Sequence, residues 1–233
     1  THPEILDWTA RRFTEQGWSL KPLHRLIMLS STYQQDSLPA PALVEHDPEN
    51  RLFGRFDVRR LEAEEIRDAL IAVGGRLDQA MGGSLLSVKN RAYFFDHTSK
   101  DLTDYSSPRR SLYLPVVRNN VYDVFQLLDY PDAAVPTGDR TTTTIAPQAL
   151  MMLNRDFITR ASSDLASLLL GTPVDDRDRV NRLYSTVDFC EATAPESTES
   201  LALLSNVEQA LPMSPTDERR LQDWACLSQV IVS

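Results

Sequence analysis

The chain has 233 residues, of which 42% are hydrophobic, so it can bury a sizeable core in one large domain or two small ones. Its net charge of -9 argues against a general phosphate-binding surface, because nonspecific affinity for nucleic acids comes from clustered Lys and Arg. No stretch approaches the roughly 18 consecutive apolar residues that a membrane span requires. We therefore expect neither a nucleic-acid partner nor a membrane-spanning segment.

Helical spacing of apolar residues, together with caps and stops, predicts a mainly α-helical fold. Pro3 suits the first turn of a helix, Ser19 is a good N-cap, and Gly74-Gly75 stops a strong apolar stripe. In chain order, the expected helices cover about 3–15, 19–30, 61–73, 121–128, a short stretch opened by Pro147, a stretch capped by Asn154 and stopped by Gly171, 177–189, 195–211, and the chain from Ser214 onward.

Other segments carry different signals. Pro39 and Pro41 mark a loop, and Asp47-Pro48 repeats the cap-then-proline signal of a helix start. Residues 85–117 lose the helical period and are rich in aromatic and β-branched residues, which favours a small extended or β-hairpin element there. Pro115 would restrict any strand to an edge.

We expect one irregular helical domain over 1–233, which would be a fragment of a longer multidomain protein because the chain begins without Met. Helices from both ends should pack around one apolar core, since each large apolar side chain that is buried contributes roughly 1.5–3 kcal/mol. The predicted core residues are Trp8, Leu26, Ile66, Leu112, Phe125, Leu150 and Leu165.

The cysteines and histidines do not form a metal-binding pattern. Cys190 and Cys226 lie far apart with no Cys-x-x-Cys spacing, so they are either buried free thiols or one disulfide, and we expect no metal site or attached haem in this chain. No two histidines have the His-x-x-x-His spacing of a ligand pair. Oxygen ligands for calcium remain an alternative without EF-hand spacing; they are Asp96, Asp101 and Asp104, or Asp129 and Asp132.

Signals for catalysis are sparse. The chain has no Gly-x-Ser-x-Gly elbow, and the threonines at 141–144 are explained more simply by helix capping than by nucleophilic chemistry. Hydrolysis by two carboxylates needs only that they meet in the fold. The available pairs are Asp123 with Asp129, and Glu62 with Glu65. Glu62 and Glu65 lie near a helix start, where the helix dipole accounts for them without any function.

Residues 109–154 interleave apolar residues with arginines, asparagines and aspartates, which resist burial unless they are paired. This pattern predicts either a polar network or a binding site. A binding site would take an anionic ligand such as an acidic or sulfated sugar, because a guanidinium binds carboxylate, sulfate or phosphate in a bidentate way. The candidate ligand-binding residues are Arg110, Tyr113, Arg118, Asn119, Asn120, Asp129, Asp132, Arg140 and Gln148.

The alternative is that the arginines of this segment pair internally and hold loops onto the helical core. The acidic partners for such pairs would be Glu62, Glu64, Asp129 and Asp132. We favour this interpretation, because a chain with 33 acidic residues offers partners everywhere.

Several separate motifs are similar to one known family. They are His2–Trp8, Gly17–Lys21, Leu26–Met28, Ser31–Tyr33, Asp47–Leu52, Arg59–Glu64, Arg109–Asn120 and Ala146–Asn154. This set, which covers about residues 1–170, resembles a domain of unknown function found near the C-terminus of planctomycete secreted proteins. Beyond about residue 175 the fit is poorer: where that family tends to have a Gly-Arg-Pro-Pro turn, this chain has Cys190–Glu196.

The resemblance implies an exported parent, periplasmic or extracellular, in which the domain follows another uncharacterised domain and often a cytochrome c-like haem module. The chain has no Cys-x-x-Cys-His, so any haem would belong to an upstream portion. We expect a non-catalytic binding or scaffolding module whose partners are other domains of the parent and an anionic sugar or polymer. The alternatives are a hydrolase or other enzyme acting on polysaccharide or another anionic polymer, and a purely structural interaction domain.

Overall fold

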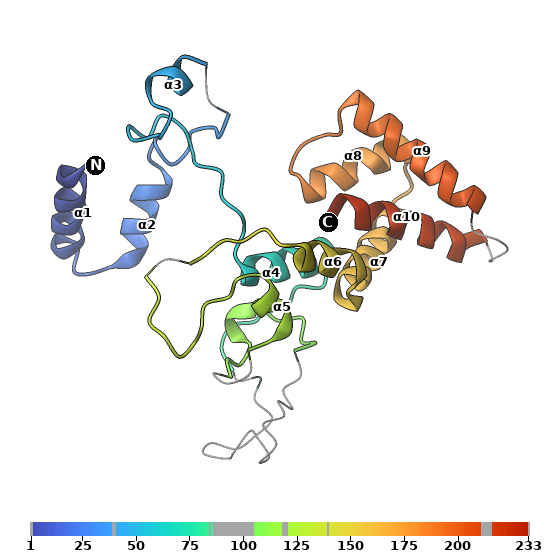
Figure 1. Cartoon of the computed structure of the whole chain (residues 1–233), viewed down its shortest axis with the longest axis horizontal. Helices are drawn as coiled ribbons and strands as arrows, with labels where there is room; N and C mark the ends of the chain where they lie inside the picture. Colours follow the sequence, from blue (N-terminus) through green and yellow to red (C-terminus); the bar gives the residue numbers. More distant parts are fainter. Residues whose placement is uncertain are drawn as a thin grey trace, which may run out of the picture. The chain divides into compact units, whose positions relative to one another are not determined.

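The computed structural model describes residues 2–38, 41–83, 85, 105–117, 121–138, 140–210 and 216–232. The chain divides into two compact units, Thr1–Arg60 and Leu61–Ser233 (Figure 1). The described residues form ten α-helices and a short 3-10 helix, with an isolated bridge between Asp78 and Arg109 in place of any named strand. The predicted mainly helical class is therefore confirmed, and the single domain over 1–233 stays a prediction.

The described residues of the first unit form three helices: α1 (Pro3–Glu15), α2 (Leu20–Met28) and α3 (Pro41–His46). Pro3 begins α1 as the sequence predicts, because proline fits the first turn of a helix. The loop predicted at Pro41 is wrong, since Pro41 begins the short helix α3. None of the three helices contains a buried residue.

A polar loop follows α3 where the cap-then-proline signal predicted a helix start. The buried carboxylate of Asp47 accepts hydrogen bonds from the backbone N–H groups of Arg51 at 2.8 Å and Leu52 at 2.7 Å. The hydrogen bond from Leu52 lowers the pKa of Asp47 most, and the bond from Arg51 lowers it further. Asn50, at φ 51°, donates from Nδ2 to the Arg55 carbonyl and to Asp57 Oδ1, both at 2.9 Å. Asp47 therefore caps a turn rather than a helix.

The second unit contains the remaining helices: α4 (Ala63–Val73), η1 (Ser111–Tyr113), α5 (Asp123–Leu127), α6 (Ala146–Asn154), α7 (Asp156–Leu170), α8 (Asp176–Val187), α9 (Ala194–Ala210) and α10 (Thr216–Val232). The boundaries lie within a few residues of those predicted. One cap is wrong: Arg155, not Asn154, is the N-cap of α7, because α6 ends at Asn154 and only Arg155 separates the two helices.

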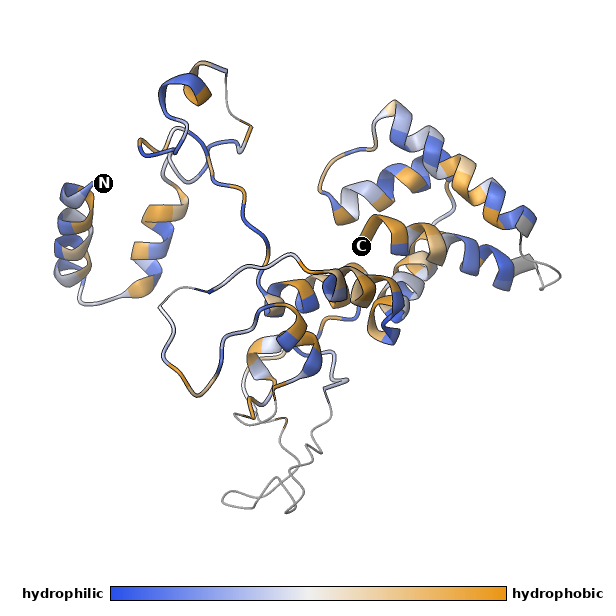
Figure 2. Ribbon diagram, viewed as in Figure 1, coloured by the Kyte–Doolittle hydropathy of each residue, from blue (hydrophilic) through white to orange (hydrophobic). Residues whose placement is uncertain are grey.

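Helix α7 is central to this unit, because it contacts α4, α6, α8 and α10. Its first half packs Ile158 against Leu70 of α4. Its second half packs Leu165 into the main cluster, with Leu183 of α8 and Trp224 of α10. A further cluster joins α4, α5 and α6 around Phe125. Figure 2 shows the apolar colouring that runs through α7 and the last turns of α10.

The predicted core is only partly correct. Phe125 and Leu165 are buried, at 4% and 2% exposure, but Trp8, Leu112 and Leu150 are exposed at 52%, 75% and 58%. Trp8 lies on α1, which buries none of its residues, and Leu112 lies in the 3-10 helix rather than in a strand. The small hairpin expected around 85–117 is not confirmed, and residues 86–104 lie outside the described part.

Within the described residues, no helix is both long enough and apolar enough to cross a membrane.

Candidate functional site

Two adjacent side chains of α4 attach the segment 105–111 to the helix. The buried guanidinium of Arg67 donates to the carbonyl oxygens of Tyr105 at 3.3 Å, Ser107 at 2.5 Å and Arg109 at 3.0 Å. The carboxylate of Asp68 accepts from Ser111 N at 2.8 Å and from Ser111 Oγ at 2.6 Å. Burial lowers the pKa of Arg67, and the Asp68 carboxylate 3.3 Å away opposes that shift.

Arg109, Arg110 and Tyr113 lie together just after this attachment. Arg109 Nη2 donates to the carbonyls of Ala80 at 2.8 Å and Gly82 at 2.5 Å, and its guanidinium lies 4.4 Å from the centre of the Tyr113 ring. The Arg110 guanidinium lies 5.8 Å from the same ring. A backbone hydrogen bond from Gly82, followed by a side-chain bond from Arg110, lowers the pKa of Tyr113.

Arg140 pairs with the start of α4. Its guanidinium donates to both carboxylate oxygens of Glu64, at 2.7 and 3.1 Å, and reaches Glu62 at 3.1 Å. The Glu64 hydrogen bond raises the pKa of Arg140, because it stabilises the charged guanidinium. These are the internal partners that the alternative interpretation of the sequence named.

Asp129 and Gln148 form a second polar group. Asp129, at φ 63°, accepts from Thr143 N at 2.8 Å and Thr143 Oγ1 at 2.6 Å. Gln148 Nε2 donates to Asp129 Oδ2 at 3.3 Å and to the Leu127 carbonyl at 2.8 Å. Asp132 accepts from Ala134 N at 2.8 Å and so stabilises its own turn.

The predicted site residues are therefore spread over three groups: Arg110 with Tyr113, Arg140 with its acids, and Asp129 with Gln148, while Asp132 lies in a turn of its own. Arg118, Asn119 and Asn120 lie outside the described residues. Internal pairing accounts for the contacts of Arg140, Asp129 and Gln148, and the assignment of these residues to a ligand stays a prediction.

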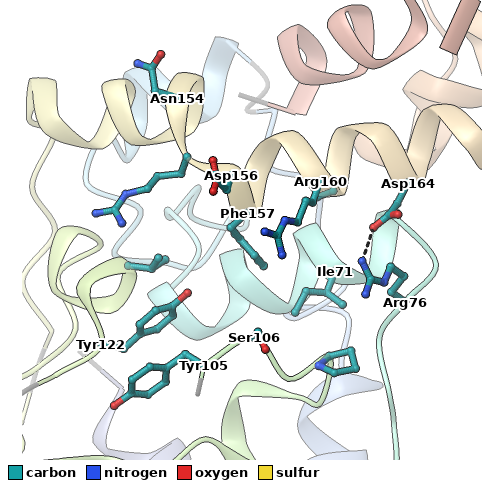
Figure 3. Close-up of a pocket in the computed structure, with 14 residues that line it drawn as sticks. Ile71, Arg76, Tyr105, Ser106, Tyr122, Asn154, Asp156, Phe157, Arg160 and Asp164 are labelled. Carbon is teal, nitrogen blue, oxygen red and sulfur yellow. Dashed lines mark hydrogen bonds and ion pairs between the residues drawn. The ribbon is translucent and has the colours of Figure 1, made fainter. Parts of the chain in front are cut away.

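A pocket of about 520 Å³ lies elsewhere in the second unit, and none of the predicted residues lines it. We call it the α4–α7 pocket. Three aromatic residues and three arginines line it: Tyr105, Tyr122, Phe157, Arg76, Arg155 and Arg160. Figure 3 shows Phe157 and Arg160 projecting from α7 toward Tyr122 and Ile71, whereas Asn154 points away from them. Pockets of this size hold small-molecule ligands in many proteins.

The aromatic wall of the pocket is ordered by stacking. The rings of Tyr105 and Tyr122 are stacked, with centroids 4.4 Å apart and an interplanar angle of 12°. Tyr122 also meets Phe125 edge to face at 5.3 Å, which fixes the pair to the apolar cluster. Burial raises the pKa of Tyr122 above its ordinary value, so its phenol is neutral at physiological pH.

The arginines of the α4–α7 pocket differ in their partners. Arg76 is paired with Asp164 at 3.1 Å, and Arg155 lies 3.9 Å from Asp123. Arg160 has no hydrogen bond or ion pair with any residue, as far as the chain is described. The lining contains these three arginines and two aspartates, Asp156 and Asp164, a formal charge of +1 in a chain whose net charge is -9.

Sequence reasoning missed this pocket because separate segments contribute to it. Tyr105 and Tyr122 belong to two different loops, and Phe157 has the helical spacing of an ordinary apolar residue of α7. The available signal was the pair of arginines, Arg155 and Arg160, on either side of Phe157.

No group of three or more His, Cys, Asp or Glu residues is placed to hold a metal ion within the described ranges. Cys190 and Cys226 are both free and exposed, so the predicted burial of the thiols is wrong and no disulfide joins them.

A family model described as "PSD1: Protein of unknown function (DUF1553)" matches residues 1–204 of the chain. No curated protein and no solved structure matches it.

Proposed function

We infer that this chain, which belongs to the PSD1 family of proteins of unknown function (DUF1553), is a non-catalytic binding module. Its α4–α7 pocket would receive an anionic ligand that contains a ring, such as an acidic or sulfated sugar. The observation that carries this proposal is Arg160, a guanidinium without a partner among the described residues, at a pocket with a stacked tyrosine wall.

The chemistry of the lining supports an anionic ligand. A guanidinium binds a carboxylate or sulfate through two parallel N–H···O bonds, and Arg160 has its donors available for them. Arg155 lies between α6 and α7, 3.9 Å from its acidic neighbour Asp123, and provides a second positive charge at the pocket. The excess of arginine over aspartate would favour an anion at this place in an otherwise acidic chain.

The aromatic wall supports a ring rather than a free inorganic ion. Tyr105, Tyr122 and Phe157 offer flat apolar surface, and ligand pockets commonly combine such surface with a few placed polar groups. The neutral phenol of Tyr122 retains a proton that it can donate to a ligand oxygen.

The carboxylates of the pocket support binding rather than hydrolysis. Glycoside hydrolysis commonly uses two carboxyl groups that face the scissile bond. The lining has two acids, Asp156 and Asp164, and Asp164 is already paired with Arg76 at 3.1 Å. That leaves one carboxylate where hydrolysis would need two.

The test is an isothermal titration of the purified chain with trigalacturonate and with a sulfated disaccharide, each compared with neutral maltotriose. We expect saturable binding of an acidic or sulfated sugar, with weaker or no binding of maltotriose. Arg160→Ala should weaken that binding by about 10- to 100-fold, because a hydrogen bond to a charged group contributes about 1.5–3 kcal/mol. Arg182→Ala, which removes an exposed arginine outside the pocket, is the matched control and should leave the affinity unchanged.

Binding should also weaken as salt rises, since the arginines of the pocket are partly exposed and are screened. Equal losses in Arg160→Ala and Arg182→Ala would contradict the proposal, because they would indicate general charge attraction. Equal affinity for maltotriose and the acidic sugars would contradict it as well.

The wider setting is a separate part of the proposal and rests on the resemblance of the sequence motifs. The parent would be an exported multidomain planctomycete protein with a c-type haem outside this chain, and its other domains would be partners of this one. Haem staining of the full-length parent after denaturing electrophoresis, on cytoplasmic and exported fractions, tests it. A stained band in the exported fraction would support this setting, and an unstained cytoplasmic band would contradict it.

A further inference from the structure

A second pocket lies among the C-terminal helices, with a cavity of about 450 Å³. We call it the α9–α10 pocket. Residues of α8, α9 and α10 line it, including Asp176, Glu208, Arg219, Arg220 and Asp223. It shares no lining residue with the α4–α7 pocket and lies outside the argument made for that site.

Asp223 is the unusual member of this lining. Its side chain lies on α10 and the residue is only 6% exposed. Its Oδ1 atom is buried and has no hydrogen-bond partner in the described part of the chain, and it is the one carboxylate oxygen in that condition there. A buried polar atom without a partner costs free energy, so such atoms in folded proteins usually meet a ligand or a water.

Arg219 lies one helical turn before Asp223 and lines the same pocket. Its Nε–H group is also buried, and it too has no partner among the residues that the structure describes. One buried acceptor and one buried donor are therefore both unsatisfied, and they belong to two residues of the same helix that line one cavity.

Two of the other charged residues of the α9–α10 pocket are paired with each other. Asp176 pairs with Arg220 at 2.7 Å and with the buried Arg179. Glu208 on α9 is exposed, and its charge adds to that of Asp223. Leu201 and Leu204 give the wall apolar surface.

These features select the chemistry of the occupant. It must donate a hydrogen bond to Asp223 Oδ1 and accept one from Arg219 Nε. An ammonium group donates but cannot accept, and a sulfate or carboxylate accepts but cannot donate. An anion would also be repelled by Glu208 and Asp223. A hydroxyl group does both, and a pair of neighbouring hydroxyls can serve both partners at once.

We propose that the α9–α10 pocket binds a neutral polyhydroxylated ligand, a sugar with adjacent hydroxyl groups, through Asp223 and Arg219. Asp223 accepts from one hydroxyl, Arg219 donates to its neighbour, and the leucines of α9 contact the apolar face of the ring.

The experiment is saturation-transfer NMR on the full chain with D-galactose, D-mannose and D-xylose, each raised to about 50 mM so that dissociation constants in the millimolar range are covered. The resonance of the Arg219 Nε–H group, assigned by its loss in Arg219→Lys, is followed in the same titration. We expect at least one sugar to bind saturably and to shift that resonance.

Asp223→Ala should weaken this binding by about tenfold, because it removes a hydrogen bond to a charged acceptor. Arg219→Lys should weaken it too, although it keeps the positive charge, because lysine has no Nε–H group in that position. Arg182→Ala is the control, and circular dichroism checks that each variant is folded. If Asp223→Ala does not fold, Arg219→Lys alone decides.

Three results would overturn the proposal. The first is that no sugar binds saturably up to about 50 mM, a range that covers even weak sites. The second is that binding occurs but is the same in the variants and in Arg182→Ala. The third is that methylammonium or sulfate, and not a sugar, shifts the Arg219 resonance. Failure here leaves the α4–α7 proposal intact, because Arg160 is tested with different ligands.

Discussion

Arg67 shows how much one polar side chain can organise. It is 1% exposed, and its donors reach three backbone carbonyls and the hydroxyl of Ser111. A planar guanidinium can serve several acceptors at once because its five N–H groups point in fixed directions. The segment 105–111, which supplies Tyr105 to the α4–α7 pocket, is therefore attached through a single residue of α4 and its neighbour Asp68.

Arg67→Met should lower the free energy of unfolding by about 3–5 kcal/mol, because it leaves several carbonyl oxygens without their donor and the carboxylate of Asp68 without its cationic partner. Urea denaturation measures this value. Arg67→Lys keeps the positive charge but not the planar guanidinium, so it should lower the free energy of unfolding by only a part of that amount. Arg182→Met, at an exposed position, should change stability by no more than about 0.5 kcal/mol. A similarly small loss for Arg67→Met would show that the network does not stabilise the fold.

Asp223 should make stability depend on pH. Burial raises the pKa of Asp223, Glu208 raises it further, and Arg219 opposes them. Between the ordinary aspartate pKa of about 3.9 and the raised folded value, the folded state binds more protons than the unfolded state. The contribution of Asp223 to the free energy of unfolding therefore falls as pH rises through this window, and is constant above it.

Asp223→Asn removes that dependence and should stabilise the chain at neutral pH but not at the acidic end of the window. Urea denaturation of both proteins over a pH series measures the difference. The gap should widen as pH rises and then stay constant. A gap that narrows as pH rises would contradict the assigned direction of the pKa shift.

The ends of helices α4 and α7 illustrate how similar sequence signals give different geometry. Both helices are followed by glycine, which the sequence predicts as their stop and which commonly takes the left-handed conformation at the end of a helix. Gly75, beyond the end of α4, has φ +71° and fits this expectation. Gly171, at the end of α7, has φ -64° and remains right-handed, although the helix stops there as the sequence predicts.

The two glycines should respond oppositely to alanine. Gly75→Ala should lower the free energy of unfolding by about 1–2 kcal/mol, because an L-residue is strained at positive φ. Gly171→Ala should raise it by about 0.4–1 kcal/mol, because its φ suits alanine and the unfolded chain loses entropy. A Cβ at Gly171 meets its nearest atoms at 3.4 and 3.5 Å, which are ordinary contacts. Losses of equal size in both variants, measured by thermal denaturation, would contradict this account.

The two units of the chain differ in how they are stabilised. In the described part of Thr1–Arg60 the only buried residues are Asp47 and Asn50, both polar. In Leu61–Ser233, α7 alone buries six residues, and its clusters extend to α4, α8 and α10. Local stability follows buried apolar contacts, so the units should open with different free energies.

Hydrogen exchange followed by mass spectrometry on the intact chain tests this difference. Amides of α1 and α2 should exchange much faster than those of α7 and α10, because the first pair buries no residue while Leu165 and Trp224 anchor the second pair. Equal protection of the amides of α1 and α7 would contradict this prediction, because it would indicate that another surface covers α1 in solution.

Most helices were predictable because their end signals are local. Pro3 and Gly74-Gly75 act through the backbone of their own segment, and the helices they delimit lie where predicted. Helix α3 was missed because Pro41 can open a helix or occupy a loop, and six residues carry no clear period. The cap at Asn154 was misplaced because the connection between α6 and α7 is a single residue.

The core and the site were harder to predict because they depend on packing between distant segments. Leu112 and Leu150 are apolar, yet the sequence does not tell which side of a short helix meets a partner. The pairing of Arg140 with Glu64 joins residues 76 positions apart. Glu62 and Glu64 were among the acids named as partners only because a chain with 33 acidic residues offers partners everywhere. The α4–α7 pocket required Tyr105, Tyr122 and Phe157 to meet, and no periodicity predicts that.

Helix α7 contributes Phe157 and Arg160 to the pocket near its beginning and Leu165 and Leu169 to the core near its end. Insertion of one residue between these halves would rotate one relative to the other by about 100°. Natural variation in this family should therefore conserve the length of α7 while it changes the side chains at its pocket end, so that specificity diverges by substitution rather than by insertion or deletion.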